Sequence, residues 1–215
     1  MILKAEVIAG QLQEGDKPET EDPLVISPQP DLKELAESGS ASVDLRLGTW
    51  FVTLRPTRKS HIEIEEKEIQ WKLAKTHYVP FGDKYYLHPG TFVLGMTLEW
   101  IRLPIGLGAY VIGKSTWGRR GLIIATATGV HPGFKGCLTL ELSNVGQVPI
   151  EIQPGMKVCQ IFIHEVQYIS SEYLDRTQFV GSRKPRLGEV SLDDIARKLG
   201  EAHHSDSSSK QVKKQ

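Results

Sequence analysis

Residues 108–115 read GAYVIGKS and match G-x-x-x-x-G-K-[ST], the pattern of a glycine-rich loop that holds nucleotide phosphates. Such a loop joins a strand to a helix, and small residues let its backbone approach the phosphates. Here the four intervening residues are Ala, Tyr, Val and Ile, a run that favours a strand. Gly118 and Gly121 follow closely and oppose a helix. We therefore interpret the match as chance, and residues 114–115 as the start of a polar loop.

A second group of candidate residues lies in CLTLELS, residues 137–143. Alternation places its leucines on one face of a strand and Thr139, Glu141 and Ser143 on the other. Such a pattern is more often a solvated strand face than a catalytic one, and a pair such as Arg119 and Arg120 is often a solvated surface pair. Sites on β scaffolds, however, are built where polar loops meet, so Glu141 is also a candidate general acid or base.

The cysteines and the composition exclude several classes of protein. Zinc nucleobase deaminases carry H-x-E followed by P-C-x-x-C, and the chain has neither, so we predict no zinc and two buried, inert thiols at Cys137 and Cys159. Two cysteines in 215 residues also predict a cytoplasmic protein without a disulfide framework. The formal net charge of zero argues against sequence-independent nucleic-acid binding. No apolar run reaches membrane-spanning length, so we expect no membrane partner.

The elements that would position these residues are mostly strands. From residue 41 onward, short apolar and alternating runs are separated by Gly and Pro turns, which predicts an all-β sandwich or barrel. Residues 58–78 are charged and are interpreted as a hairpin or an excursion. Helical spacing is confined to three short segments: residues 2–12 with Leu3, Val7 and Ile8 on one face, residues 31–37, and residues 191–199 behind a capping box that begins at Ser191. Residues 202–215 have the composition of a disordered tail.

Several segments together resemble the dCTP deaminases, within the trimeric dUTPase superfamily. The resemblance covers roughly residues 41–188. It rests on the order and spacing of SASVDLRLG, HPGTFVLGMTLEWIRLP, KSTWGRRGL, TATGVHPGFKGCLTLEL, PGMKVCQIFI and QFVGSRKP. In the same order, these segments resemble six parts of that family. The first three are an early strand, a turn and strand ending at Leu-Pro, and an R-S-S-x-x-R-x-G-L loop. The last three are a strand ending in L-E, a P-G-M-x-I-x-Q strand and a C-terminal tail.

The resemblance implies a distorted jelly roll or β-barrel of the dUTPase-like, β-clip type, with short peripheral helices. Residues 1–40 would be an N-terminal helix and loop packed on a barrel of residues 41–170. Residues 171–200 would form a C-terminal closing segment and a short helix, ahead of a disordered tail over residues 201–215. The family assembles as a homotrimer with active sites between subunits and deaminates dCTP to dUTP and ammonia without zinc. Mg²⁺ accompanies the triphosphate.

The resemblance also assigns roles to individual residues. Glu141 corresponds to the general acid/base, and Ser115 and Arg119 to the residues that hold the water and the pyrimidine end. Water adds at C4 of cytosine, N3 gains a proton and ammonia leaves, so one carboxyl group that takes and returns a proton serves every step. The loop that binds the triphosphate corresponds to Lys114, Ser115, Thr116 and Arg119. Further nucleotide contacts fall at Thr139, Gln160 and Phe179, and Lys184 lies in the closing segment.

Three positions depart from the family pattern. Lys114 replaces an arginine and lacks its bidentate fork, and Phe179 replaces a tyrosine. His131 stands where an aspartate is usual, and that aspartate helps the diphosphatase branch to position its attacking water. Because a neutral imidazole is not a permanent anion, we predict a deaminase that releases dUTP. His131 is also consistent with a purely structural role in the turn before Pro132.

Two other activities stay open at this point. A dUTPase or a bifunctional enzyme would convert its substrate to dUMP. A non-catalytic deoxynucleotide-binding protein would keep the fold and lose the chemistry. Thymidine triphosphate, an inhibitor of some relatives, is a further potential ligand.

Overall fold

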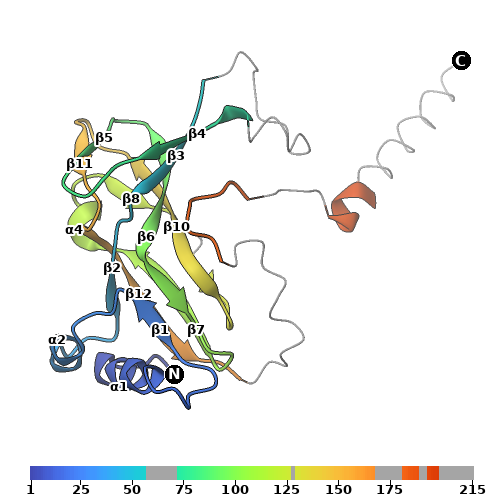
Figure 1. Cartoon of the computed structure of the whole chain (residues 1–215). Helices are drawn as coiled ribbons and strands as arrows, with labels where there is room; N and C mark the ends of the chain where they lie inside the picture. Colours follow the sequence, from blue (N-terminus) through green and yellow to red (C-terminus); the bar gives the residue numbers. More distant parts are fainter. Residues whose placement is uncertain (57–71, 127–128, 168–180, 189–192, 199–215) are drawn as a thin grey trace, which may run out of the picture. The chain divides into compact units, whose positions relative to one another are not determined.

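The structure, a computed structural model, describes residues 1–56, 72–126, 129–167, 181–188 and 193–198. The chain divides into two compact units. One unit comprises Met1–Arg55 and Ala74–Arg186, and the other comprises Pro56–Leu73 and Leu187–Gln215. All the strands described below belong to the first unit (Figure 1). The segmentation predicted from the sequence, with boundaries at residues 40, 170 and 200, stays a prediction.

The strands of the first unit form antiparallel sheets, which confirms the all-β prediction (Figure 1). The largest sheet has the order β4-β3-β6-β10-β8, with β1 also paired to β6. Its strands are β1 (Val25–Ser27), β3 (Trp50–Leu54), β4 (Ala74–Tyr78), β6 (Phe92–Arg102), β8 (Leu122–Ile124) and β10 (Lys135–Asn144). A second sheet has the order β2-β12-β7-β9, and a third pairs β11 with β5. Their strands are β2 (Val43–Arg46), β12 (Lys157–Glu165), β7 (Leu107–Gly113), β9 (Gly129–Val130), β5 (Tyr85–Leu87) and β11 (Ile150–Ile152).

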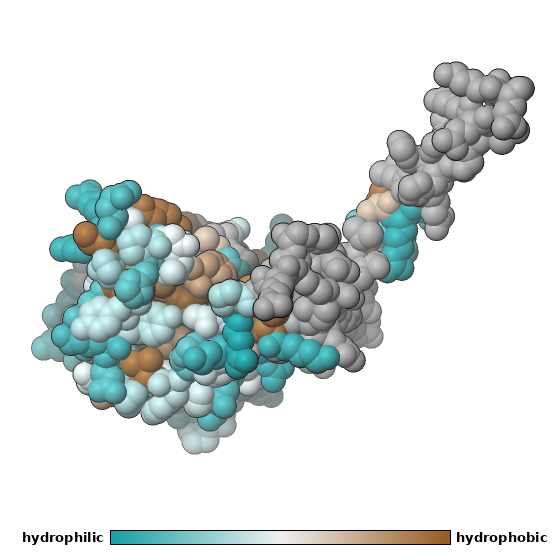
Figure 2. All heavy atoms as spheres, turned by 90° about the horizontal axis from the view of Figure 1, so that it is seen from above, coloured by the Kyte–Doolittle hydropathy of each residue, from teal (hydrophilic) through white to brown (hydrophobic). Residues whose placement is uncertain are grey.

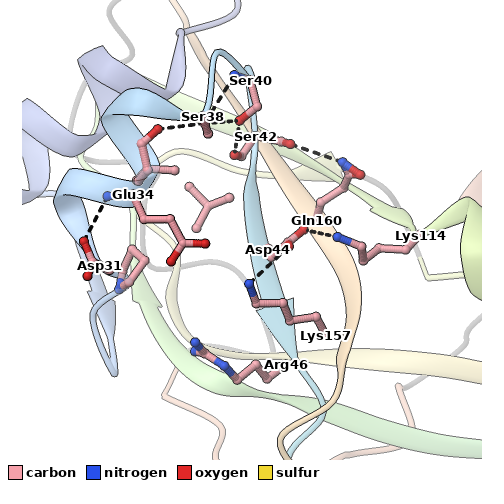
Figure 3. A pocket seen from close by; sticks show the side chains of 13 residues that line it. Asp31, Glu34, Ser38, Ser40, Ser42, Asp44, Arg46, Lys114, Lys157 and Gln160 are labelled. Atoms are coloured by element: carbon pink, nitrogen blue, oxygen red, sulfur yellow. Dashed lines mark hydrogen bonds and ion pairs between the residues drawn. The ribbon is translucent and has the colours of Figure 1, made fainter.

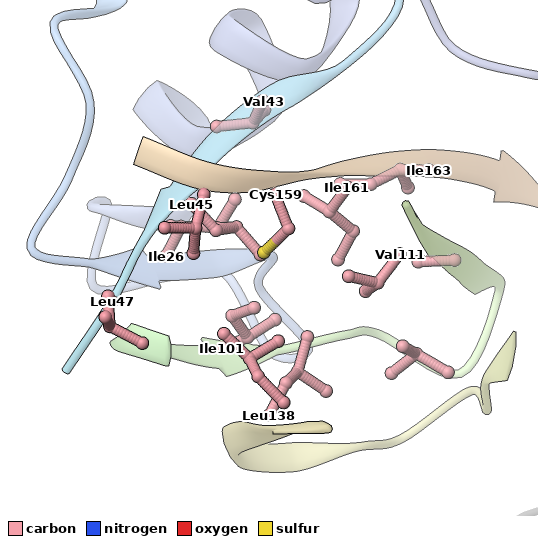
Figure 4. Packing of buried hydrophobic residues seen from close by; sticks show 14 of the residues in the cluster. Ile26, Val43, Leu45, Leu47, Ile101, Val111, Leu138, Cys159, Ile161 and Ile163 are labelled. Atoms are coloured by element: carbon pink, nitrogen blue, oxygen red, sulfur yellow. The ribbon is translucent and has the colours of Figure 1, made fainter. Parts of the chain in front are cut away.

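The hydrophobic core contains inward-facing side chains of both large sheets (Figure 4). Leu45, Val111 and Ile161 come from the four-stranded sheet, and Ile101 and Leu138 from the other; all are buried. Strand alternation produces this arrangement, because every second residue points inward. In β10 the leucines are buried and the residues between them are half-buried, as the alternation of CLTLELS predicts.

Cys159 lies inside this core, whereas Cys137 is only half-buried. Burial raises the pKa of the Cys159 thiol to about 12, so this thiol stays protonated and inert near neutral pH. Burial also raises the pKa of Cys137. The prediction of two buried thiols is therefore confirmed for Cys159 and wrong for Cys137, which has a partly accessible side chain.

The N-terminal helix is α1 (Ala5–Gly15), displaced by three residues from the predicted segment. Its buried face comprises Ala5, Ile8, Ala9 and Leu12. Val7, which the sequence analysis placed on that face, is 45% exposed. The reason is periodicity: Ala5, Ile8 and Leu12 follow the helical repeat, and Val7 falls outside their stripe.

The second predicted helix is present as α2 (Leu32–Glu37). The Asp31 carboxylate accepts the backbone N–H groups of Lys33 and Glu34 at 3.0 and 2.9 Å, so it caps the helix. Gly39 follows with φ 65°, a left-handed conformation that ends the helix where the sequence predicted.

Two other predicted segments are described only in part. Strand β4 pairs with β3 and forms the end of the predicted hairpin or excursion, whereas residues 57–71 lie outside the described residues. Residues 194–198 are helical, and the Asp193 carboxylate accepts the N–H of Ala196 at 2.7 Å. Asp193 therefore caps this segment, whereas Ser191 and the tail over residues 202–215 lie outside the described residues.

The face of the described residues seen in Figure 2 is mostly hydrophilic, with separate hydrophobic areas. Exposed aromatic and aliphatic side chains include Tyr110 and Ile112 of β7, which are 48% and 52% exposed. The described part of the chain contains no helix long and apolar enough to cross a membrane.

Asn144 is expected to be important for stability. Its buried amide nitrogen donates to the carbonyls of Leu87 and Val148 at 2.8 and 2.9 Å, and its oxygen accepts the N–H of Gly146 at 2.8 Å. We expect Asn144→Ala to lower the free energy of unfolding by about 2–4 kcal/mol in denaturant titrations, because three backbone groups lose their partner. Ser143→Ala is the neighbouring control, with an expected change below about 1 kcal/mol; equal stabilities of the two variants would contradict this assignment.

Candidate active site

The polar loop after β7 is a single helical turn, α4 (Ser115–Gly118), with Lys114 at its N-cap. Residues 108–113 lie within β7, paired with β12, so the segment is not a phosphate-holding loop of the G-x-x-x-x-G-K-[ST] type. We expected no helix after Ser115, and this is wrong. One helical turn begins at Ser115 and ends at Gly118. Ser115, Thr116 and Arg119 are all exposed. The predicted triphosphate-binding residues therefore lie at the surface of the first unit.

Two hydrogen bonds connect this turn to β12. The Trp117 indole N–H donates to the carbonyl of Lys157 in β12 at 2.9 Å. The backbone N–H of Lys114 donates to the carbonyl of Val158 at 3.0 Å. The position of the Ser115 loop is thus set by the first residues of β12.

A polar pocket of about 330 Å³ opens between α2 and the four-stranded sheet (Figure 3). Two of the predicted nucleotide-binding residues, Lys114 and Gln160, line it. The other charged side chains around it are Asp31, Glu34, Asp44, Arg46 and Lys157. The pocket therefore combines three cationic side chains with three carboxylates, and it is the described cavity that contains the most predicted site residues.

Within this pocket Asp44 lies between two lysines (Figure 3). The Lys114 ammonium is 2.5 Å from one carboxylate oxygen of Asp44, and the Lys157 ammonium is 3.6 Å from the other. Gln160 is directly opposite Asp44 on the paired strand, and its amide donates to the Ser42 hydroxyl at 3.1 Å. Lys114 and Gln160, which are 46 positions apart in the sequence, are thus brought together by the pairing of β7, β12 and β2.

Glu141 and Thr139 lie on the half-buried polar face of β10. The backbone of Glu141 pairs with the chain just beyond β8: its N–H donates to the Thr126 hydroxyl at 3.3 Å, and its carbonyl accepts the N–H of Ala125 at 2.9 Å. Among the described residues, no hydrogen bond or ion pair joins the Glu141 carboxylate to Ser115 or Arg119. These two bonds fix the backbone of Glu141 beside the segment that follows β8.

His131 is exposed and occupies the turn between β9 and β10. Its carbonyl accepts the N–H of Phe134 at 3.2 Å, and Gly133 between them has φ 74°. These contacts involve only the backbone, and no hydrogen bond or ion pair of the His131 imidazole is found among the residues that the structure describes.

The C-terminal segment follows the beginning of β10. The N–H of Gly181 donates to the carbonyl of Lys135 at 2.6 Å, and the N–H of Cys137 donates to the carbonyl of Ser182 at 3.0 Å. The Lys184 ammonium lies 4.0 Å from the centre of the Trp50 ring, a cation–π contact. Phe179 lies outside the described residues.

Of the charged pocket residues, the sequence analysis proposed only Lys114 and missed five others, among them Asp44 and Lys157. The alternation of ASVDLRLG already places Asp44 on the polar face of β2, so this signal was available. Lys157 gave no such signal, because regular alternation would put it on the same face as Cys159 and Ile161. Its actual orientation depends on an irregularity in the pairing of β12 with β2, between Lys157 and Cys159.

No group of three or more His, Cys, Asp or Glu side chains close enough to hold a metal ion is found among the residues that the structure describes. Magnesium usually keeps several waters and is held by one or two carboxylates together with substrate phosphates.

Comparisons with known proteins agree with the fold and identify a family. A family model described as dCTP deaminase-like matches residues 17–166. The chain is 40% identical over 168 residues to a dCTP deaminase of Halorubrum lacusprofundi, covering 78% of each protein. It is 33% identical over 198 residues to a protein of Methanobrevibacter smithii named dCTP deaminase, dUMP-forming, covering 89% of this chain and 96% of that one.

A solved structure shares the fold. The crystal structure of 2'-deoxycytidine 5'-triphosphate deaminase from Agrobacterium tumefaciens superimposes with a TM-score of 0.54 at 25% identity. The match covers 75% of this chain but 47% of that chain, so this chain spans about half the length of the solved protein. With the family model covering most of its length and relatives at about 40% identity, the chain belongs to the dCTP deaminase-like family.

Proposed function

We propose that this protein is a hydrolase that deaminates dCTP to dUTP and ammonia. The observation that carries the proposal is the family membership over residues 17–166. The sequence resemblance supports it, because it assigns Ser115, Arg119 and Glu141 to the reacting centre. The placement of Glu141 supports it, because this residue is half-buried on β10, a strand inside the largest sheet, with its backbone hydrogen-bonded on the β8 side.

In the proposed reaction Glu141 moves protons between water and the cytosine ring. The Glu141 carboxylate removes a proton from a water held near Ser115 as the water oxygen attacks C4 of the ring. Glu141 then gives that proton to N3, the second proton of the added water moves to the amino group, and ammonia leaves. Arg119 offsets the negative charge that develops as the tetrahedral adduct forms. Water is consumed once, and the products are dUTP and ammonia.

The phosphate end of the nucleotide would be held by the residues around α4 and the pocket beside α2. Lys114, Ser115, Thr116 and Arg119 lie on the exposed loop, and Gln160 lines the same pocket as Lys114. Lys184 would close over the phosphates from the C-terminal segment. Magnesium bound to the triphosphate supplies charge neutralisation, and the protein contributes the cationic side chains that orient the phosphates.

We further propose that the active enzyme is a homotrimer located in the cytoplasm. Two observations support assembly. Glu141 has no hydrogen bond or ion pair with Ser115 or Arg119 within the described part of one chain, and the outer face of β7 exposes Tyr110 and Ile112. Exposed apolar side chains of this kind often mark a protein interface. Sites completed between neighbouring subunits would account for both.

A bifunctional enzyme that ends at dUMP is the second candidate, since the Methanobrevibacter relative and a 40% identical Dictyoglomus thermophilum relative are both named dUMP-forming. His131 favours release of dUTP, because an aspartate is usual at that position in the family and a neutral imidazole cannot supply its permanent negative charge.

Product analysis with purified protein tests the proposal. After incubation with dCTP and Mg²⁺, we expect chromatography to show dUTP and an equal amount of ammonia, with little dUMP or pyrophosphate. A product mixture dominated by dUMP and pyrophosphate would establish the bifunctional alternative. Tight binding of dCTP without turnover would identify a non-catalytic nucleotide-binding protein. His131→Asp is a useful companion variant, because increased dUMP formation in it would tie the choice of product to this position.

A further inference from the structure

The β-bulge at the start of β12 places a charged side chain beside two predicted nucleotide-binding residues. Between the pairs Lys157–Arg46 and Cys159–Leu45, β12 contains one more residue than β2. Val158 and Cys159 are therefore both buried in succession, and Lys157 lies on the same outer face as Gln160. In a regular strand, two residues three positions apart point to opposite faces. Bulges commonly redirect a side chain near a functional site.

The redirected lysine shares a carboxylate with Lys114. The two ammonium groups lie at 2.5 and 3.6 Å from different oxygens of Asp44, and all three side chains line the pocket that also contains Gln160 (Figure 3). Lys157 is the more available of the two lysines. Its side chain is 48% exposed against 26% for Lys114, and its contact with Asp44 is the longer one. An exposed pair of this kind contributes little to stability.

The other charged groups of the pocket are less available to a ligand. The Arg46 guanidinium is 2.9 Å from the buried carboxylate of Glu99. The Asp31 carboxylate caps α2. Glu34 lies on the α2 side, where its negative charge disfavours a phosphate (Figure 3). A polyphosphate would therefore lie on the sheet side of the pocket, beside Lys114 and Lys157.

We propose that Lys157 is a further polyphosphate-binding residue, which the β12 bulge places beside Lys114 and Gln160. The inference rests on the proposed function, because it assigns the ligand of that same site. Lys114 has replaced an arginine and lost its bidentate fork, and Lys157 supplies a second cation to the same phosphates. Asp44 holds both ammonium groups in position until the nucleotide and its magnesium bind. Lys157 acts through binding and takes no part in the proton transfers.

The test compares Lys157→Met with Lys157→Arg and with Lys75→Met as a matched control. Lys75 is an exposed lysine of β4, in the other large sheet. Substitution by methionine leaves the backbone carbonyl of residue 157 in place. This carbonyl accepts the hydrogen bond from the Trp117 indole N–H, so the α4 turn stays attached to β12. We expect Lys157→Met to raise the KM for dCTP with Mg²⁺ by roughly tenfold and to leave kcat within about twofold, as expected for loss of one charged phosphate contact. Lys157→Arg should recover most of the affinity, and Lys75→Met should match the unmodified protein.

Calorimetric titration of the same variants separates phosphate binding from structural effects. Lys157→Met should weaken the binding of dCTP and of sodium tripolyphosphate by about the same factor, and it should weaken the binding of dCMP far less. An unchanged dissociation constant for dCTP, or an equal loss for dCMP and dCTP, would overturn the inference. If the unmodified protein binds dCTP without converting it, the proposed activity fails, yet the dissociation constants still decide the role of Lys157. If it binds neither dCTP nor tripolyphosphate, both proposals are wrong.

Discussion

Replacing Glu141 with glutamine is expected to lower kcat for dCTP deamination by about 10³-fold, while the dissociation constant for dCTP changes only a few-fold. The carboxamide keeps the size of the side chain and its hydrogen-bonding capacity but cannot take a proton from water. The half-buried position on β10 and the backbone bonds to Thr126 and Ala125 should hold the substituted side chain in place. Single-turnover measurements of ammonia release, paired with calorimetric titration of dCTP, separate chemistry from binding.

Glu151→Gln is the control for this substitution. Glu151 lies in β11 and forms an exposed ion pair with Lys84 at 3.0 Å, outside the proposed site. The Glu151→Gln variant should retain full activity, and loss of the ion pair with Lys84 should have a small effect on stability. If Glu141→Gln deaminated dCTP at the normal rate, another group would have to carry the proton, and the proposed mechanism would fail.

Replacing Arg46 with methionine is expected to produce the largest loss of stability, about 3–5 kcal/mol in the free energy of unfolding. Glu99 is 1% exposed, and its carboxylate accepts both the guanidinium and the backbone N–H of Arg46 at 2.9 and 2.8 Å. Removing the guanidinium leaves a buried carboxylate without its counter-charge. Denaturant titrations measure the loss, and a second substitution, Glu99→Leu, should restore much of it because no charge then stays buried.

The same pair predicts a pH dependence. Burial raises the pKa of Glu99 above its usual value of 4.5, and the contacts with Arg46 act in the opposite direction. Folded protein therefore binds this proton more tightly than unfolded protein, so the contribution of Glu99 to stability decreases as pH rises above about 4.5. Without Arg46 the pKa rises further. The loss in the free energy of unfolding caused by Arg46→Met should thus be larger at pH 8 than at pH 5.

Arg102→Met provides the matched comparison. Arg102 pairs with Asp22 at 3.1 Å, but the Asp22 side chain is 38% exposed and stays hydrated when the arginine is lost. We expect a cost of about 1 kcal/mol or less from loss of this ion pair, with little change between pH 5 and pH 8. If Arg46→Met were no more damaging than Arg102→Met, burial of Glu99 would not have the energetic consequence assigned to it.

Much of the fold was predictable because its signals are local. The alternation of CLTLELS predicts which side chains of β10 face the core, and the structure confirms it. Asp31 and Gly39 mark the ends of α2 as capping chemistry predicts. The α1 face was predicted less well, since Val7 is apolar but lies outside the helical stripe. The resemblance to the dCTP deaminases also came from the sequence, through the order of several short segments.

Four features follow from the amino-acid sequence alone: the strand-rich fold class, the polar face that carries Glu141, the segment that carries Ser115 and Arg119, and the family. The burial of Glu99 against Arg46, and the position of Lys157 beside Lys114 and Asp44, emerge in the folded chain. Faces and caps follow from neighbouring residues, so they can be read along the chain. Arg46 lies 53 positions from Glu99 and Lys114 lies 70 positions from Asp44. The orientation of Lys157 depends on one extra residue in a pairing between distant strands. Strand register and bulges are set by packing of the whole sheet, which no local pattern contains.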